Sequence, residues 1–327
     1  MITVIGASNL TKIYVRGTLL NRIAIRALDE VDLTVRSEDG SPRIISLVGE
    51  SGSGKTTFAK VLLRLVRPNT GQVVVYDRVL VGEKVRPDKQ EFLSMIQPIF
   101  QEPSETFSAY QPIDSYLRRT ATQVSRLVGR AATEAIEDAL ASVGLKYADV
   151  KGKYLSQFSG GELQRLSIAR ALIASPKLIV ADEPVSMLDA SLRMNVINLF
   201  LRLKEEYGTS FLYVTHDLST AYYISDYIAV MYRGSICEFG KARDVLRDPQ
   251  HPYTQLLLSS IAVVGKKWPR DDIRLADMET QEYQLQGCKF QGRCPYAEPI
   301  CARERPRQAV LDDQRQVYCH LFTREKV

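Results

Sequence analysis

Residues 43–65 constrain the fold more than any other stretch of the chain. Their sequence is RIISLVGESGSGKTTFAKVLLRL: an apolar, β-branched run, a turn of glycine and serine, and then apolar residues at helical spacing. This pattern predicts a strand, a loop and a helix in direct succession. The prediction leaves the loop between the two elements as the first place to look for chemistry.

Three further apolar runs have the length of strands. They lie at 177–182, 210–217 and 226–234, and the first is wholly apolar between its terminal Lys177 and Asp182, as in a strand buried on both faces. Residues 188–208 place apolar side chains on one helical face and end at Gly208, a favourable residue after a helix C-terminus. Strands that alternate with helices predict a mostly parallel sheet in an α/β core.

Two regions depart from this alternation. Residues 112–175 show helical patterns without a strand between them, which predicts a helical subdomain inserted into the core. After residue 245, residues 248–262 predict one more helix, and 263–287 are polar and aperiodic, as in a linker. A tail with four cysteines follows.

The bulk properties limit the possible partners. The net charge of +5 comes from 43 basic and 38 acidic residues mixed along the chain, so no basic block indicates binding to nucleic acid. The N-terminus lacks a secretory signal pattern, and no apolar run approaches the length of a membrane span. We therefore expect a soluble, cytosolic protein whose association with a membrane requires another subunit.

The loop in the first stretch fits G-x-x-x-x-G-K-[ST] from Gly49 to Thr56. Its glycines let backbone amides surround phosphate oxygens, and the following helix adds a partial positive charge. Lys55 would reach the β- and γ-phosphates of a nucleotide, and the Thr56 hydroxyl would bind Mg²⁺. The residues predicted to bind ATP here are Gly49, Glu50, Ser51, Gly52, Ser53, Gly54, Lys55, Thr56 and Thr57.

Two adjacent carboxylates end the strand at 177–182. Ligands of parallel sheets bind at the carboxyl ends of the strands, where Asp182 and Glu183 stand. Asp182 is suited to the Mg²⁺ shell, and Glu183 to polarising an attacking water. The alternative is a pair of helix-capping carboxylates without catalytic function.

A third candidate anion site lies in residues 154–172, YLSQFSGGELQRLSIARAL. Ser159, Gly160 and Gly161 can present a hydroxyl and free amides at the start of a helix. With this segment the chain resembles the ATP-binding subunits of ABC transporters. Its sequence FSGGE, residues 158–162, is similar to the signature motif of that family. Phe158 and Glu162 replace the usual leucine and glutamine of that motif, whereas the Ser-Gly-Gly part is retained.

The other landmarks of that family occur in the family's order. Gln101 matches the loop glutamine that contacts Mg²⁺, and SMLD, with Ser186 and Asp189, resembles the D-loop. His216 resembles the switch histidine of the γ-phosphate, and Tyr14 matches the aromatic that stacks on adenine. Alone, His216 and Tyr14 would more often be ordinary structural residues. The order of all the motifs together is what carries the resemblance.

The resemblance implies a fold and partners. The fold is an α/β P-loop ABC ATPase core at 1–245 with a mostly parallel sheet, an antiparallel β part and the helical subdomain, followed by a small cysteine-rich extension at 246–327. Two ATP-binding subunits, here expected to differ, pair head to tail, so that Ser159, Gly160, Gly161 and Glu162 face the partner's ATP. Two permease subunits and an extracellular solute-binding protein complete the assembly, at the cytoplasmic face of the membrane.

The resemblance also implies the chemistry. Lys55, Mg²⁺ and His216 would act on the phosphate, and Glu183 on the water, so that ATP hydrolysis powers import of a solute of the peptide or oligosaccharide type. The alternatives are a non-transport ABC ATPase and a regulatory subunit that only senses nucleotide. The first usually carries a long coiled coil or two cassettes, which this sequence lacks, and the presence of Glu183 and His216 argues against the second.

The tail carries Cys288, Cys294, Cys301 and Cys319. In a reducing cytosol, grouped cysteines indicate a metal before a disulfide. The gaps are wide for zinc, whereas four thiolates, one of them followed by Pro295, suit a [4Fe-4S] cluster better. Zinc and unligated thiols stay open as alternatives, and His320 is either a substitute ligand or, more often, a capping or surface residue. The tail resembles the C-terminal extension of oligopeptide/dipeptide-type importers, some of which bind such a cluster. The fifth cysteine, Cys237, is predicted to be a small core residue.

Overall fold

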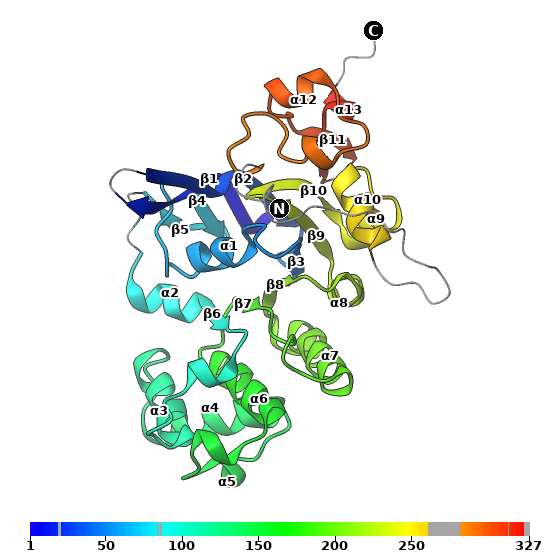
Figure 1. Ribbon diagram of the computed structural model, residues 1–327. Helices are drawn as coiled ribbons and strands as arrows, with labels where there is room; N and C mark the ends of the chain where they lie inside the picture. Colours follow the sequence, from blue (N-terminus) through cyan, green and yellow to red (C-terminus); the bar gives the residue numbers. More distant parts are fainter. Residues whose placement is uncertain (19–20, 84, 86, 261–281, 313, 324–327) are drawn as a thin grey trace.

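The structure is a computed structural model that describes residues 1–18, 21–83, 85, 87–260, 282–312 and 314–323. A layered β/α body lies in the middle of the molecule, with the helical region on one side of it and the cysteine-containing region on the opposite side (Figure 1). Most of the predicted linker lies outside the described residues.

An eight-stranded sheet forms the centre of the body, in the order β11-β12-β10-β9-β3-β8-β7-β6. The strands from β9 to β6 are parallel, and the other three are antiparallel to their neighbours. The predicted mostly parallel sheet is therefore confirmed. The bounds are β3 (Ile44–Val48), β6 (Ile96–Ile99), β7 (Leu178–Asp182), β8 (Ser210–Thr215), β9 (Tyr227–Tyr232), β10 (Ser235–Lys241), β11 (Ala309–Asp312) and β12 (Arg315–Val317).

Both faces of the parallel strands are buried, which is why their sequences are almost wholly apolar. On one face, Leu47 and Val214 pack in a cluster with helix α1 (Lys55–Leu62). On the other face, Phe211 packs with α7 (Ala190–Tyr207), the helix predicted from 188–208. Helix α7 ends at Gly208, whose φ of 65° is the left-handed conformation predicted for a C-terminal glycine.

A second, antiparallel sheet covers the α1 side of the body, in the order β2-β1-β4-β5. Its first two strands form a long hairpin that register shifts interrupt at several points. This sheet is the antiparallel β part that the family resemblance implied. Its strands are β1 (Ile2–Thr18), β2 (Asn21–Ser37), β4 (Thr70–Val75) and β5 (Arg78–Gly82), and α2 (Lys89–Met95) leads from it to β6.

The helical region is confirmed as predicted: the described residues between 112 and 175 contain helices and no strand. It shares a hydrophobic cluster with α7 and one face of the large sheet, so it is not a free-standing unit. Its helices are α3 (Ile113–Gln123), α4 (Gly129–Ser142), α5 (Tyr147–Val150) and α6 (Gly160–Leu172).

The C-terminal region is attached to the large sheet through β12, which pairs with β10. Phe290 packs with Tyr232 of β9 and Tyr253 of the preceding helix α10. The division at residues 245 and 246 stays a prediction. The remaining elements of the described residues are η1 (Pro103–Thr106), η2 (Leu155–Gln157), α8 (Leu218–Ile224), α9 (Ala242–Arg247), α10 (Pro252–Ser259), η3 (Gln291–Arg293), α12 (Pro299–Arg303) and α13 (His320–Thr323).

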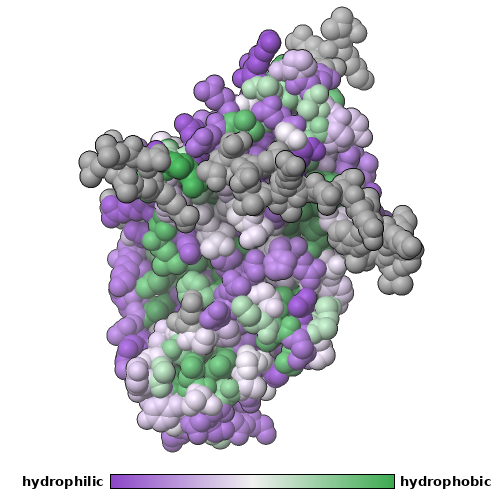
Figure 2. Space-filling model, viewed as in Figure 1, coloured by the Kyte–Doolittle hydropathy of each residue, from purple (hydrophilic) through white to green (hydrophobic). Residues whose placement is uncertain are grey.

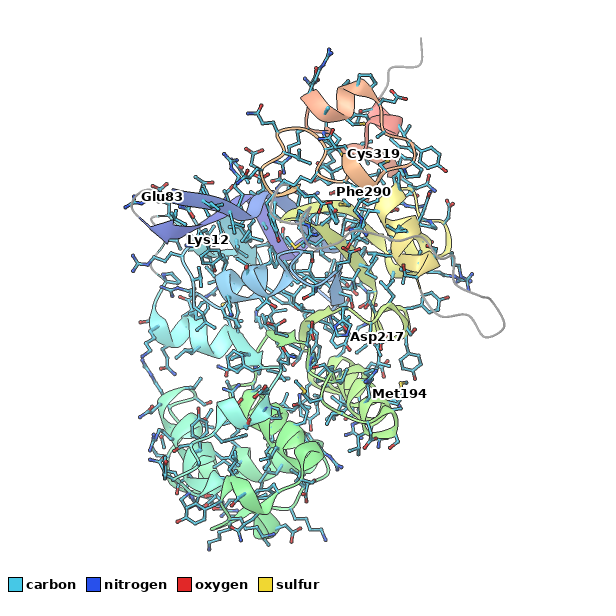
Figure 3. The ribbon with its side chains drawn as sticks, viewed as in Figure 1. Lys12, Glu83, Met194, Asp217, Phe290 and Cys319 are labelled. Carbon is cyan, nitrogen blue, oxygen red and sulfur yellow. The ribbon has the colours of Figure 1, made fainter. Side chains whose placement is uncertain are left out.

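A group of three packed aromatic rings holds α7 against the sheet and gives a stability test. The ring of Phe200 is fully buried, with its centroid 4.9 Å from that of Phe211 and 6.3 Å from that of Tyr213. We expect Phe200→Ala to lower the free energy of unfolding by about 3–5 kcal/mol, because the cavity cannot fully collapse. Met194→Ala, on the exposed side of the same helix (Figure 3), should cost far less in the same urea titration. Equal losses in both variants would contradict the assigned packing.

Candidate functional site

The loop between β3 and α1 requires glycine at two positions. Gly49 has a φ of 150°, and a β-carbon there would lie 2.2 Å from the carbonyl oxygen of Met231. Gly54 has a φ of 108°, and a β-carbon would lie 2.5 Å from the carbonyl oxygen of Ala27. Neighbouring backbone therefore encloses the loop closely, and any other residue would force the loop to shift.

Lys55, the first residue of α1, is buried inside this loop. Its ammonium donates hydrogen bonds to the carbonyl oxygens of Gly49 (2.8 Å) and Glu50 (2.9 Å). Burial lowers the pKa of Lys55, and the nearby carboxylates of Glu183 and Asp182 oppose that shift. An ammonium in this position can exchange its carbonyl partners for phosphate oxygens.

A pocket of about 640 Å³ opens over the loop. Tyr14 contributes to its wall from the N-terminal hairpin, and Tyr283 contributes from the C-terminal region. The structure thus brings the predicted adenine-stacking residue to the predicted phosphate loop. The lining residues are Tyr14, Val15, Ile25, Ala27, Ser51, Gly52, Ser53, Gly54, Lys55, Thr56, Thr57, Glu183 and Tyr283.

The predicted Mg²⁺ ligands Thr56 and Asp182 lie together beside the pocket. The Thr56 hydroxyl donates to Oδ1 of Asp182 over 3.3 Å, and burial raises the pKa of this carboxyl. A hydroxyl and a carboxylate fit Mg²⁺, which is usually held by one or two protein oxygens together with water and substrate phosphates. The third predicted ligand, Gln101, is an exposed residue just after β6 and is not among those that line the pocket.

Glu183 and His216 meet across the ends of two neighbouring strands. Oε1 of Glu183 lies 3.2 Å from Nδ1 of His216, and the histidine side chain is 61% exposed. Glu183 has a φ of 46°, uncommon for a residue other than glycine, and its amide donates to the carbonyl of Val214. This bond continues the parallel pairing of β7 with β8, and the left-handed φ of Glu183 then turns the chain. The Glu183 side chain lines the pocket.

The Ser-Gly-Gly segment begins helix α6 and lies apart from this pocket. Ser159 caps the helix, because its hydroxyl oxygen accepts from the backbone amide of Glu162 over 3.3 Å. In return, Oε2 of Glu162 accepts from the amide (2.8 Å) and hydroxyl (2.7 Å) of Ser159. The hydrogen bond from the serine hydroxyl lowers the pKa of Glu162. Glutamate and glutamine both serve in such a capping box, so Glu162 fits a position where the family usually has glutamine.

The predicted D-loop follows β7 and Glu183. Ser186 donates its hydroxyl to the carbonyl of Glu183 over 2.9 Å. Asp189 is the N-cap of α7: its carboxylate accepts from the amide of Leu192 (2.9 Å), a bond that lowers the pKa of Asp189. These bonds fix the turn between Glu183 and α7.

The four tail cysteines line one small cavity. Cys288, Cys294, Cys301 and Cys319 share it with His251 and His320. Burial raises the pKa of each thiol, that of Cys288 to about 12. As placed, no group of three or more His, Cys, Asp or Glu side chains in the described ranges could hold a metal ion. Cys319 lies in the cysteine-containing region at the edge of the molecule (Figure 3), whereas Cys237 is buried in β10, as predicted for a core residue.

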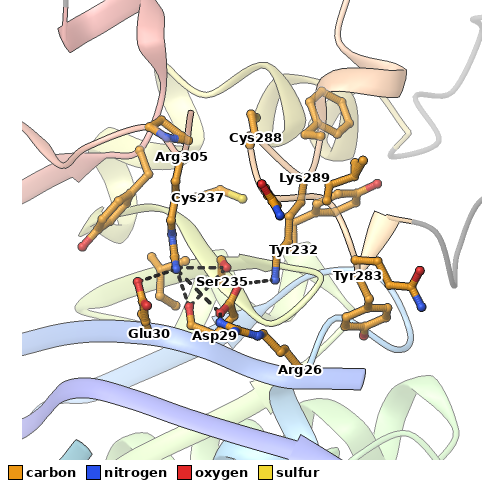
Figure 4. A pocket seen from close by; sticks show the side chains of 18 of the residues that line it. Arg26, Asp29, Glu30, Tyr232, Ser235, Cys237, Tyr283, Cys288, Lys289 and Arg305 are labelled. Atoms are coloured by element: carbon orange, nitrogen blue, oxygen red, sulfur yellow. Dashed lines mark hydrogen bonds and ion pairs between the residues drawn. The ribbon is translucent and has the colours of Figure 1, made fainter. Parts of the chain in front are cut away.

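A second cavity, of about 740 Å³, separates β2 from the C-terminal region. In it, Asp29 lies between three cations (Figure 4): Arg26 at 3.1 Å, Lys289 at 2.7 Å and Arg305 at 3.7 Å. Arg305 also contacts Glu30 at 2.7 Å. Because two of these cations belong to the C-terminal region, the ion pairs attach that region to the N-terminal hairpin.

Three residues that the sequence interpretation did not identify contact the phosphate loop. The Tyr253 hydroxyl accepts from the Glu50 amide, Arg293 binds the Glu50 carboxylate, and the Tyr283 hydroxyl donates to the carbonyl of Gly52. These residues are 203 to 243 positions along the sequence from their partners, and no sequence motif spans segments so far apart. Only the resemblance of the tail to a family extension hinted at a role for this part of the chain.

Comparisons with known proteins agree with this geometry. A family model described as "ABC transporter" matches residues 28–186, and one described as "Oligopeptide/dipeptide transporter, C-terminal region" matches residues 237–301. The oligopeptide transport ATP-binding protein AppF of Bacillus subtilis is 35% identical over 302 residues, which cover 91% of this chain and 90% of AppF. OppF of Salmonella typhimurium, also an oligopeptide transport ATP-binding protein, is 37% identical over 286 residues (86% and 84%).

A solved structure extends the likeness to three dimensions. The ATP-binding cassette MJ0796, described as a dimer in a post-hydrolysis state bound to ADP and Pi, has a TM-score of 0.63 and 26% identity. The match covers 73% of this chain and 99% of MJ0796. In the part of the chain that the structure describes, no helix is long and apolar enough to cross a membrane.

Proposed function

The chain belongs to the ABC transporter family of ATP-binding subunits, and from this premise we propose that it hydrolyses ATP to power peptide import through partner membrane subunits. The observation that carries the proposal is the pocket in which Tyr14, the glycine loop, Lys55 and Glu183 come together. The relatives at 35% and 37% identity are oligopeptide transport ATP-binding proteins, which favours peptides over oligosaccharides.

ATP binding follows from the arrangement of the pocket. In this proposal the adenine stacks on Tyr14, and the loop amides and Lys55 hold the phosphates. Thr56 and Asp182 would hold Mg²⁺. Gln101, which does not line the pocket, would be a further ligand only as the family resemblance implies. When bound, Mg²⁺ neutralises phosphate charge.

Hydrolysis requires a water aligned with the γ-phosphate. The Glu183 carboxylate orients that water and accepts its proton, while His216, 3.2 Å from the carboxylate, contacts the γ-phosphate and completes the site. The bond between water and phosphorus forms as the bond to ADP breaks, and the products are ADP and inorganic phosphate. Lys55 stabilises the charge that develops on the phosphate oxygens.

The site is completed by a second ATP-binding subunit, expected to be a different chain. MJ0796, at 26% identity, is described as a dimer with ADP and Pi, which supports pairing of cassettes. In this proposal Ser159, Gly160 and Gly161 contact the partner's ATP, which is consistent with their place outside the chain's own pocket. Ser186 and Asp189 lie at the contact between the subunits.

Transport requires membrane partners, because this chain would supply only the energy. We propose two permease subunits and an extracellular solute-binding protein, with this chain at the cytoplasmic face of the membrane. Figure 2 shows hydrophobic residues gathered on the surface at the end of the molecule formed by α3 to α6, amid hydrophilic ones. A patch of this kind suits docking to another subunit.

Reconstitution with the permeases and binding protein tests the proposal. In proteoliposomes, ATP hydrolysis should rise when peptide and binding protein are both supplied, and labelled peptide should enter the lumen. Oligosaccharide-dependent hydrolysis without a response to peptides would reassign the substrate class. Full hydrolysis by the chain with no solute dependence in any assembly would favour a non-transport ATPase.

We also propose a [4Fe-4S] cluster as the ligand of the cysteine cavity. The support is that four of the five cysteines line one cavity, while Cys237 lies outside it. In such a cluster each of the four cysteine thiolates binds a different iron, so the four thiols need not converge on a single metal ion. When bound, the cluster would cross-link the segments that carry the four thiols.

The cluster proposal has a direct test. After anaerobic purification, the wild-type chain should contain about four irons and four acid-labile sulfides and show the visible absorption of an iron–sulfur cluster. Cys294→Ser should lose the iron, whereas Cys237→Ser, outside the cavity, should retain it. Equal iron in the two variants, or zinc in place of iron, would overturn the assignment.

A further inference from the structure

Glu50, the second residue of the phosphate loop, turns its side chain away from the nucleotide pocket. Its two carboxylate oxygens accept from the two terminal nitrogens of Arg293, each over 2.9 Å. The pair is partly buried, with the Arg293 side chain 11% exposed. Two parallel charge-assisted bonds fix both the distance and the orientation of the carboxylate.

A second contact holds the backbone of the same residue. The Glu50 amide donates to the hydroxyl of Tyr253 over 2.9 Å, and Tyr253 is fully buried. The Glu50 carbonyl in turn accepts from the ammonium of Lys55. Glu50 therefore lies between an anchor outside the loop and the lysine that binds phosphate.

The anchor itself is rigid. The guanidinium of Arg293 lies 5.8 Å from the ring centroids of Tyr232 and Phe290. These two rings and that of Tyr253 pack together, with centroid separations of 4.5 Å for Tyr232 and Tyr253 and 5.4 Å for Phe290 and Tyr253. Because this group of three aromatic rings is buried, the position of Arg293 is set by β9, α10 and the C-terminal region together.

We propose that Arg293 is a positioning residue of the ATP site. It fixes Glu50, and through Glu50 it holds Lys55 and the loop in the form that receives phosphate. Arg293 ends η3 and directly precedes Cys294, so the cysteine-containing region acts on ATP affinity without touching ATP. The inference rests on the proposed ATPase function and adds to it a control of nucleotide binding by the tail.

A substitution of Arg293 should raise the Michaelis constant for ATP and leave the turnover number almost unchanged. Arg293→Gln removes the charged fork, and the loop then spends less time in the competent form, which weakens apparent affinity in proportion. Loss of a charge-assisted pair of this kind should raise the KM for ATP about tenfold. The turnover number at saturating ATP should change less than about twofold, because bound ATP reforms the loop and the catalytic groups are intact.

Arg305 supplies the matched control. It too attaches the C-terminal region to the body, through Glu30 and Asp29 instead of the loop. Arg305→Gln should lower the thermal midpoint of the chain as Arg293→Gln does, and leave the KM for ATP unchanged. Arg293→Lys keeps the charge and loses the fork, so it should recover part of the affinity.

The experiment measures ATP-Mg²⁺ binding to the full chain by calorimetry, together with steady-state hydrolysis. A double-mutant cycle with Glu50→Gln tests the pair: Arg293→Gln and Glu50→Gln together should weaken ATP binding no more than either alone. Affinities of Arg293→Gln and Arg305→Gln within twofold of each other, or additive effects in the cycle, would overturn the inference. Absence of ATP binding by the wild-type chain would instead overturn the proposed function.

Discussion

Glu183→Gln should nearly abolish ATP turnover and trap ATP-bound dimers of the assembled complex. The amide keeps the size of the side chain but cannot accept the proton of the attacking water, so hydrolysis should slow by a factor of about 100 to 10,000. ATP binding should be intact, because Lys55 and the loop are unchanged and the backbone N–H of residue 183 still donates to the Val214 carbonyl. Size-exclusion chromatography with ATP and Mg²⁺ should show the closed pair accumulating.

Glu205→Gln provides the control for this result. Glu205 is an exposed glutamate of α7, so the variant makes the same chemical change on the same chain away from the site. It should hydrolyse ATP at the wild-type rate. Undiminished steady-state hydrolysis by Glu183→Gln would remove Glu183 from the mechanism.

Lys55→Met should weaken ATP binding by about a hundredfold, because the phosphates lose their principal cation and its charge-assisted hydrogen bonds. The thermal midpoint should fall little. Methionine matches the length of the buried side chain and removes a charge that burial disfavours, as the lowered pKa of Lys55 shows. Calorimetric titration with ATP-Mg²⁺ and a thermal melt of the same sample measure both effects.

The matched control is Lys60→Met, on the exposed side of the same helix. It removes one positive charge near the site without touching the loop, and ATP affinity should stay within about twofold of the wild type. Were Lys55→Met to bind ATP as tightly as Lys60→Met, the phosphate role of Lys55 would be wrong.

The sequence predicted best what depends on local pattern. Strands buried on both faces have almost uniformly apolar sequences. Helix α7 ends at a glycine, the residue type that most readily adopts the left-handed conformation found there. The long hairpin of β1 and β2 was not located from residue pattern. Its register shifts interrupt the alternation that marks a strand, and only the family resemblance implied an antiparallel part.

The candidate site likewise contains residues that could be predicted from a local sequence motif and residues that could not. The loop from Gly49 to Thr56 is a contiguous motif, so its residues could be named in advance. That Tyr14 lies over this loop followed from resemblance alone. The anchoring of Glu50 by Arg293 was out of reach, because it depends on the packing of segments 243 positions apart and leaves no period or spacing in the sequence.

The distance along the chain between Glu50 and Arg293 also has a consequence during synthesis. At about 5–20 residues per second, a ribosome needs roughly 10 to 50 seconds to pass from the loop to the arginine. During that interval the nascent chain carries a complete phosphate-binding motif without its anchor. If Arg293 positions the loop as proposed, the loop becomes anchored only after the tail has been made and has packed against β9.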